Sequence, residues 1–149
     1  MTRDDAQKKF NTQCVLGYMT ALNASRTYSD SDKISKLIIS DEKDFSPIEF
    51  NDAFDKSAWQ YGALGFFRRS VIGGCLDEKN ALCVADELGL SRLAVSYFVQ
   101  NDVVWFFSYD DTKPSVILKG VDGTTRGTGE TISEAVVMAE NNKMNVHMN

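Results

Sequence analysis

The sequence is poor in the residues that most enzymes use for acid–base and metal chemistry. Its 149 residues include a single histidine, His147, and three cysteines, Cys14, Cys75 and Cys83. A Ser–His–Asp or Cys–His mechanism would have to use this one histidine close to the end of the sequence. No CxxC pair or neighbouring histidine indicates a metal site. We therefore expect no enzyme activity, no cofactor and no bound metal, and we interpret the three cysteines as reduced thiols, mostly in the core.

Long hydrophobic runs are also missing. No apolar stretch approaches the roughly 20 residues that a membrane-spanning helix requires. The first five residues, Met1 to Asp5, are polar and include two acids, which is not typical of a signal peptide. Hydrophobic residues make up 43% of the chain, enough for an ordinary globular core. The sequence thus predicts a single cytoplasmic domain over residues 1–149 that has no contact with a membrane.

A surplus of basic residues is absent, because 16 Lys and Arg face 21 Asp and Glu, for a formal net charge of −5. The imbalance is concentrated between residues 30 and 55, which hold eight acids and three bases, 8 − 3 = 5 in excess. An acidic segment of this kind can steer a chain toward a basic partner. Its candidate partner-binding residues are Asp41, Glu42, Asp44, Glu49 and Asp52.

Helical spacing dominates the first half of the chain. Phe10, Cys14, Tyr18 and Leu22 recur every four residues and predict a helix over about 4–23. Ser46-Pro47 is a typical helix start, and Gly73-Gly74 is a natural end. Two glycines between them, Gly62 and Gly65, indicate a kink or a close helix contact. A short helix over 77–88 completes a helical half that covers about residues 1–89.

Strand patterns dominate the second half, about residues 90–142. Alternating apolar residues predict a strand over 93–99, and two more β-rich runs follow at 103–109 and 115–121. Thr131 to Glu134 then form a capping-box pattern that opens a helix from Ile132 to about Asn142. The predicted fold class is α+β. N-terminal helices pack on a small three-stranded antiparallel sheet, and the C-terminal helix buries Ile132, Ala135, Val136 and Ala139, which share one face.

The stretch Val84 to Val99 also resembles the helix-turn-helix of DNA-binding proteins. A small Ala85 precedes the turn, Gly89 stands where the turn requires a positive φ, and apolar residues occupy the inward positions. The resemblance implies that residues 103–109 and 115–121 form a wing. The residues that it places toward a major groove are Ser91, Arg92, Ser96, Tyr97 and Gln100. Against DNA binding, residues 61–149 carry only eight Lys and Arg beside eleven Asp and Glu.

Two further features concern surfaces. Trp105 and Phe107 share one face of the predicted second strand and Phe106 lies on the other, so a sheet covered on one side cannot bury all three. One aromatic face is then available to a partner, and we select Trp105 and Phe107 as candidate contacts. The glycine-rich stretch from Gly120 to Gly129 precedes a helix but lacks the P-loop pattern, which favours a flexible connection over a phosphate site.

These observations lead to two hypotheses for function. The first is a non-enzymatic regulator or inhibitor that binds a basic protein through the acidic segment or the aromatic strand; a second copy of the chain is also an open partner. The alternative is a winged helix-turn-helix DNA-binding regulator. The two differ in the conformation of residues 93–99, which are a strand in the first interpretation and a recognition helix in the second.

Overall fold

A computed structural model describes residues 3–38, 53–101, 103–108, 115–120, 126–129 and 131–148. The first two helices are α1 (Arg3–Ser25) and the short α2 (Ser31–Ser35). Three more follow: α3 (Ala53–Ile72), α4 (Glu78–Glu87) and α5 (Arg92–Gln100). Three short strands, β1 (Val103–Ser108), β2 (Ser115–Gly120) and β3 (Arg126–Gly129), come before α6 (Ile132–Met148). None of the helices among these residues is long and apolar enough to cross a membrane.

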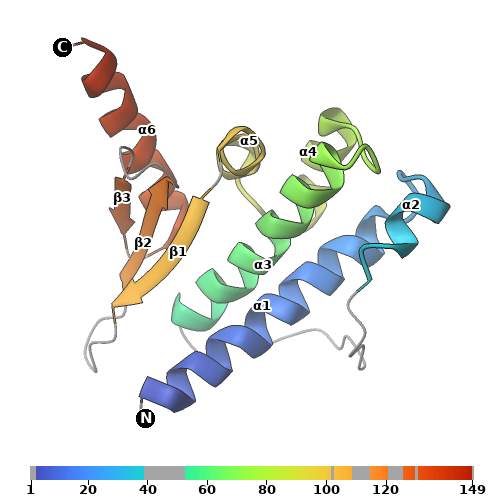
Figure 1. Ribbon diagram of the computed structural model, residues 1–149, viewed down its shortest axis with the longest axis horizontal. Coiled ribbons are helices and arrows are strands. Elements are labelled where there is room, and N and C mark those ends of the chain that lie inside the picture. Colours follow the sequence, from blue (N-terminus) through green and yellow to red (C-terminus); the bar gives the residue numbers. More distant parts are fainter. Residues whose placement is uncertain are drawn as a thin grey trace.

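The main structural axis is the pair α1 and α3, which lie side by side and run in the same direction (Figure 1). Residues at corresponding positions along the two helices contact each other, as expected for a parallel pair. Near the N-termini, Lys9 Nζ lies 3.0 Å from the buried Asp55 Oδ1. Farther along, the rings of Tyr18 and Phe66 pack edge to face with centroids 5.4 Å apart. The two helices therefore keep one register over most of their length.

Glycine makes the closest approach of α1 and α3 possible. A Cβ placed on Gly17 would overlap the Trp59 carbonyl, and a Cβ on Gly62 would overlap the Cys14 carbonyl. Each helix thus contributes one glycine at which the partner backbone takes the place of a side chain. The predicted close contact at Gly62 is confirmed, and Gly74, with φ +73°, ends the segment that follows α3 as predicted. The predicted start at Ser46 lies outside the described residues.

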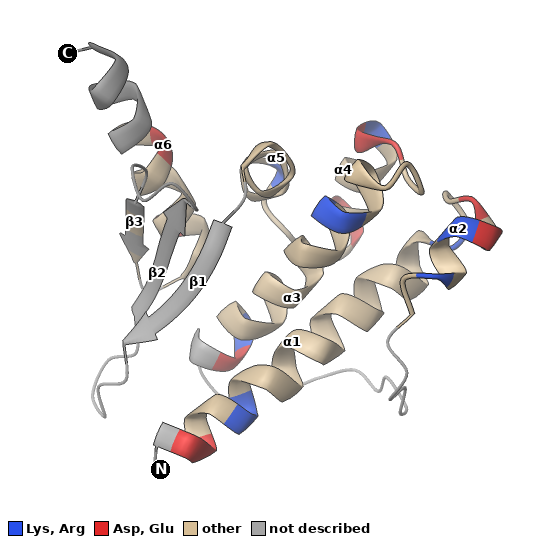
Figure 2. Cartoon of the chain, viewed as in Figure 1, with Lys and Arg blue, Asp and Glu red and all other residues tan. Residues whose placement is uncertain are grey.

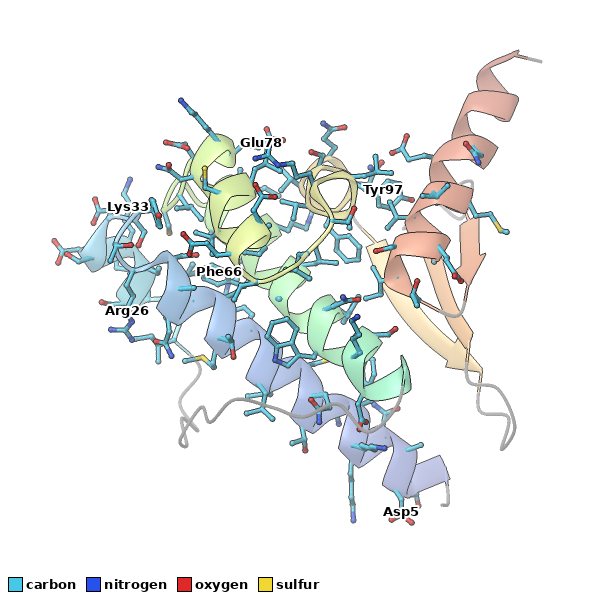
Figure 3. All side chains as sticks on the ribbon, turned by 180° about the vertical axis from the view of Figure 1, so that it is seen from behind. Asp5, Arg26, Lys33, Phe66, Glu78 and Tyr97 are labelled. Carbon is cyan, nitrogen blue, oxygen red and sulfur yellow. The ribbon has the colours of Figure 1, made fainter. Side chains whose placement is uncertain are left out.

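The core is formed by helices. The largest fully buried side chains include Met19, Leu22, Phe66, Phe67 and Tyr97, which come from α1, α3 and α5. Figure 3 shows Phe66 inside this helical body and Glu78 at its outer edge. Burial of these apolar side chains is the main stabilising contribution to the fold.

The strands and α6 form a separate layer beside the helical body (Figure 1). The strand order is β1-β2-β3 with antiparallel pairing, in which position 105 lies opposite 118 and position 118 opposite 127. α6 packs on β3, and a Cβ on Gly127 would overlap the Ala135 carbonyl. Gly127 and Gly129 therefore serve close packing of a strand on a helix, so residues 126–129 are not the predicted flexible connection; residues 121–125 of that stretch lie outside the described residues.

The predicted fold class, α+β with N-terminal helices packed on a three-stranded sheet, is wrong. The interpretable part of the structure is mostly helical, at 78% helix, and the core is built from helices and not on a sheet. Residues 93–99, predicted as the first strand, lie within α5. α1 and α3 pack on each other and on α5, so the long helices do not form a layer over strands. The pattern misled because the same stretch also has helical spacing in Ala94, Val95, Tyr97 and Phe98, the residues that α5 buries.

The C-terminal helix has the predicted inner face. Ile132, Ala135, Val136 and Ala139 are at most 1% exposed, which confirms all four positions. Thr131 Oγ1 accepts a hydrogen bond of 3.2 Å from the Glu134 backbone N–H, as expected for the helix start. The helix continues to Met148, beyond the predicted end near Asn142. Two outward residues, Val137 and Met138, remain 47% and 44% exposed.

Candidate interaction surface

α4 and α5 form a helix-turn-helix unit, which we define as residues 77–100. Asp77 caps α4 by accepting a 2.8 Å hydrogen bond from the Asn80 backbone N–H. Gly89 adopts φ +71° in the turn, and the Leu90 N–H closes the turn by donating to the Ala85 carbonyl at 2.8 Å. The positive φ predicted for Gly89 is therefore confirmed. Ser91 then caps α5 by accepting from the Ala94 N–H at 3.3 Å.

The inner face of α5 joins the unit to the rest of the molecule. Ala94, Val95, Tyr97 and Phe98 are buried, and α5 packs on both α3 and α6. The Phe98 ring meets Tyr61 of α3 at 75°, with centroids 5.9 Å apart. This face therefore belongs to the core and is not available to a protein partner.

Arg68 of α3 satisfies the carbonyl groups at the C-terminal end of α5. Its Nη1 donates to the carbonyl oxygens of Phe98, Val99 and Asn101 at 2.9, 3.1 and 2.8 Å. The last carbonyls of a helix lack partners inside the helix and carry a partial negative charge, so a guanidinium suits this position. Local sequence patterns contain no signal for this cap, because Arg68 is some thirty positions from the carbonyls that it contacts.

The outer face of the unit, which we define by Arg92, Leu93, Ser96 and Gln100 of α5, is open to solvent. Arg92, Leu93 and Gln100 are exposed and Ser96 is half-buried. Arg92 forms a two-point ion pair with Asp86 of α4, with Nη2 2.5 Å and Nε 3.1 Å from Oδ2. The hydrogen bond from Arg92 lowers the pKa of Asp86 below its usual value. The guanidinium is thus already neutralised within the unit.

Carboxylates outnumber cations on this unit (Figure 2). Asp77, Glu78, Asp86 and Glu87 are exposed, and the basic residues between 77 and 100 are Lys79 and Arg92. Tyr28 donates a 3.2 Å hydrogen bond to Glu87 Oε1, which raises the pKa of Tyr28. The unit therefore carries a net negative charge, which disfavours phosphate groups and favours cationic groups.

The five residues predicted to face a major groove do not share one exposed surface. Ser91 uses its hydroxyl as the cap of α5, and Arg92 is bound to Asp86. Ser96 and Gln100 lie on the outer face as the resemblance implies. Tyr97 is only 1% exposed, so its predicted position toward DNA is wrong. The error arises because consecutive residues of a helix point in directions 100° apart, which places Tyr97 on the core side of Ser96.

The residues predicted to bind a protein partner are not brought together among the described side chains. Asp41, Glu42, Asp44, Glu49 and Asp52 lie outside the described residues. Trp105 and Phe107 belong to β1, of which the structure describes the backbone. Register places positions 105 and 107 on the same sheet face as Gly127 and Gly129, which is the face that lies against α6.

The cysteines are too dispersed to suggest a metal site. Among the described residues, no group of three His, Cys, Asp or Glu side chains could hold a metal ion. All three cysteines are free thiols. Cys14 Sγ donates to the Ala58 carbonyl at 3.2 Å inside the α1–α3 interface, and burial raises the pKa of this thiol to about 12. A thiol of this kind is structural and a poor nucleophile at neutral pH.

Comparison with known proteins does not identify a family: no family model, no curated protein and no solved structure matches the chain.

Proposed function

We propose that the chain is a non-enzymatic interaction protein that binds a basic protein partner through the outer face of the helix-turn-helix unit. The observation that carries this proposal is the ion pair of Arg92 with Asp86 within an excess of carboxylates. A nucleic-acid surface needs cations that are free to meet phosphates, whereas here the arginine of the outer face is already paired. A cationic protein surface gains from the same charge pattern.

The exposed Leu93 supports a protein partner as well. Its side chain is 45% exposed beside the polar residues Ser96 and Arg92. Protein interfaces combine an apolar contact at the centre with a polar rim, and this arrangement suits such a contact. The predicted acidic residues Asp41, Glu42, Asp44, Glu49 and Asp52 enter the proposal as further candidate contacts. Trp105 and Phe107 do not, because their positions lie on the sheet face against α6.

The second candidate is a winged helix-turn-helix regulator that binds DNA. The observation in its favour is the chain order of α4, turn and α5, followed by the antiparallel pair β1 and β2. This order is that of a winged helix-turn-helix. In this case Arg92 would have to leave Asp86 in order to reach a phosphate or a base.

A photo-crosslinking amino acid at position 93 of the full chain, in cells that express it naturally, distinguishes the two functions. Ile72, which is 60% exposed at the end of α3, is the matched control position. We expect position 93 to form an adduct with one basic protein and position 72 not to form it. Replacing Glu78 and Glu87 by Lys reduces this adduct, because it removes the excess of carboxylates on the unit.

Each alternative result has a defined meaning. A DNA adduct at position 93 would transfer the conclusion to the second candidate. No adduct with either macromolecule would contradict both functions. In a parallel test, replacing Asp41, Glu42 and Asp44 by Lys weakens the association if the acidic segment contributes, and unchanged binding removes that segment from the proposal.

A further inference from the structure

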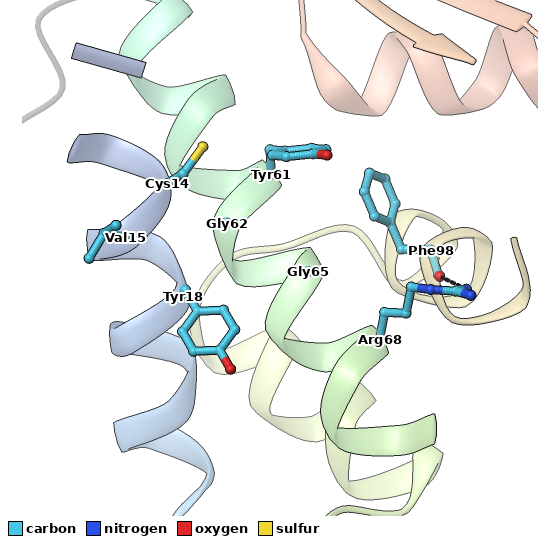
Figure 4. A pocket seen from close by; sticks show the side chains of 8 residues that line it. All are labelled: Cys14, Val15, Tyr18, Tyr61, Gly62, Gly65, Arg68 and Phe98. Carbon is cyan, nitrogen blue, oxygen red and sulfur yellow. Dashed lines mark hydrogen bonds between the residues drawn. The ribbon is translucent and has the colours of Figure 1, made fainter. Parts of the chain in front are cut away.

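A pocket of about 300 Å³ opens between α1, α3 and α5 (Figure 4). Its apolar walls include the rings of Tyr18, Tyr61 and Phe98, and Arg68 is its cationic member. Binding pockets for small molecules start at about 300 Å³ and combine apolar walls with a few polar groups. The pocket thus has the size and the wall chemistry of a site for a small molecule.

The pocket exists because position 65 lacks a side chain. Gly65 lies in the middle of α3, where glycine is the least favourable residue after proline. It has no positive φ, and a Cβ built on it would meet nothing within 4 Å. Neither backbone conformation nor a close helix contact therefore requires glycine here, in contrast to Gly62 one turn earlier. What Gly65 provides is open volume on the pocket wall.

Arg68 supplies a positive charge that has no carboxylate partner among the described residues. Its Nη1 is occupied by the three carbonyl oxygens at the end of α5. For Nε and Nη2 the described residues contain no hydrogen-bond acceptor. These two nitrogens form the side of a guanidinium that binds a carboxylate through two parallel hydrogen bonds.

We propose that this pocket binds a small aromatic carboxylate. The aromatic group lies over Gly65 against the contacting rings of Tyr61 and Phe98, and the carboxylate accepts hydrogen bonds from Arg68. Aromatic rings in this setting favour edge-to-face or offset contacts with a planar ligand. The site lies at the C-terminal end of α5, whereas Leu93 of the proposed protein-binding face lies at the N-terminal end.

The test is a titration of the full chain with indole-3-acetate, followed by backbone amide chemical shifts. We expect saturable shifts that cluster at Gly62, Gly65 and Phe98. The neutral analogue indole-3-acetamide should bind at least about tenfold more weakly, because it lacks the charge that Arg68 recognises. A Gly65→Leu variant fills the pocket and should lose at least about tenfold in affinity while it melts at the same or a higher temperature.

Lys79→Leu adds the same side chain on the exposed surface of α4 and serves as the control, for which we expect unchanged affinity. The proposal is overturned if no saturable shifts occur, if the shifts lie elsewhere, if the amide binds as well as the acid, or if Gly65→Leu retains affinity. None of these outcomes bears on the crosslink at Leu93, so the two proposals fail independently.

Discussion

Two regions of the molecule depend on glycine at a close backbone approach, and they use it differently. In the α1–α3 interface each helix provides one glycine, Gly17 and Gly62, and aromatic pairs lie along the contact. In the β3–α6 interface both glycines belong to the strand: Gly127 faces Ala135 and Ala139, and Gly129 faces Glu134 and Ala135.

The first arrangement holds two long helices in one register, whereas the second lets a short strand lie flat on α6. The comparison shows that the structural role of a glycine depends on the element that packs against it. In a helix it marks a helix crossing, and in a strand beside a helix it marks a contact that sequence patterns mistake for a loop.

The largest expected effect is the loss of stability in Gly62→Ala. The new Cβ would overlap the Cys14 carbonyl. Because this group belongs to the backbone of α1, it cannot move aside as the end of a flexible side chain could. We expect a decrease of about 3 kcal/mol in the free energy of unfolding, measured with urea. Gly65→Ala is the matched control on the same helix, and it should stabilise the protein by up to about 1 kcal/mol. Equal effects of the two substitutions would contradict the helix-crossing role of Gly62.

Gly127→Ala should destabilise the other region by about 2 kcal/mol, because its Cβ would overlap the Ala135 carbonyl. Amide hydrogen exchange can localise the effect. We expect faster exchange in α6, while the amides of α1 and α3 keep their protection. Loss of protection in α1 and α3 as well would show that the two interfaces unfold together, and the comparison would then fail.

Alkaline pH, combined with a substitution of Cys14, provides a probe of the α1–α3 interface. Burial raises the pKa of the Cys14 thiol from its usual 9.0 to about 12. Between these pH values the unfolded chain has lost the Cys14 proton and the folded chain retains it, so stability falls as the pH rises from about 9 toward 12. Cys14→Ala should make the stability curve flatter in this range. An unchanged slope would mean that Cys14 is not held in the interface as described.

Arg92→Ala should have the smallest effect, because the Arg92–Asp86 pair is on the surface and touches neither glycine interface. We expect an unfolding midpoint in urea within error of the unsubstituted protein. In a gel-retardation assay with duplex DNA at low salt, the variant should behave like the unsubstituted protein. A clear loss of DNA retention would support the second candidate function and would contradict the proposed protein partner.

Local patterns were sufficient for elements whose signals are short-range. The positive φ of Gly89, the end of the α3 segment at Gly73-Gly74 and the buried face of α6 all follow from such signals. Helical spacing also predicted α1 and α4 to within a few residues of their ends. These features depend on contacts within one or two helical turns, which the sequence displays directly.

The conformation of residues 93–99 could not be decided in this way. β-branched and aromatic residues favour a strand, and their spacing suits both periods. The helix is stabilised by Ser91 at its start, by Arg68 at its end, and by the burial of Val95 and Tyr97 against other helices. Only the first of these is visible locally. The predicted fold class is wrong for the same reason. Residues 93–99 were assigned to the first strand of a sheet, whereas they form α5 and contribute to a helical core.

The features of the candidate sites also fall into two groups, those that the sequence predicts and those that it does not. The sequence identified Arg92, Ser96 and Gln100 as outward positions of a helix-turn-helix, but not the neutralisation of Arg92 by Asp86 or the burial of Tyr97. It contained no signal for the Arg68 cap or for the open volume at Gly65. Charge balance and turn chemistry belong to the chain itself, because they follow from composition and from neighbours in sequence. The partners of Arg68, Gly62 and Gly127 belong to the tertiary structure, because they lie eight to forty-eight positions away and meet only when separate elements pack.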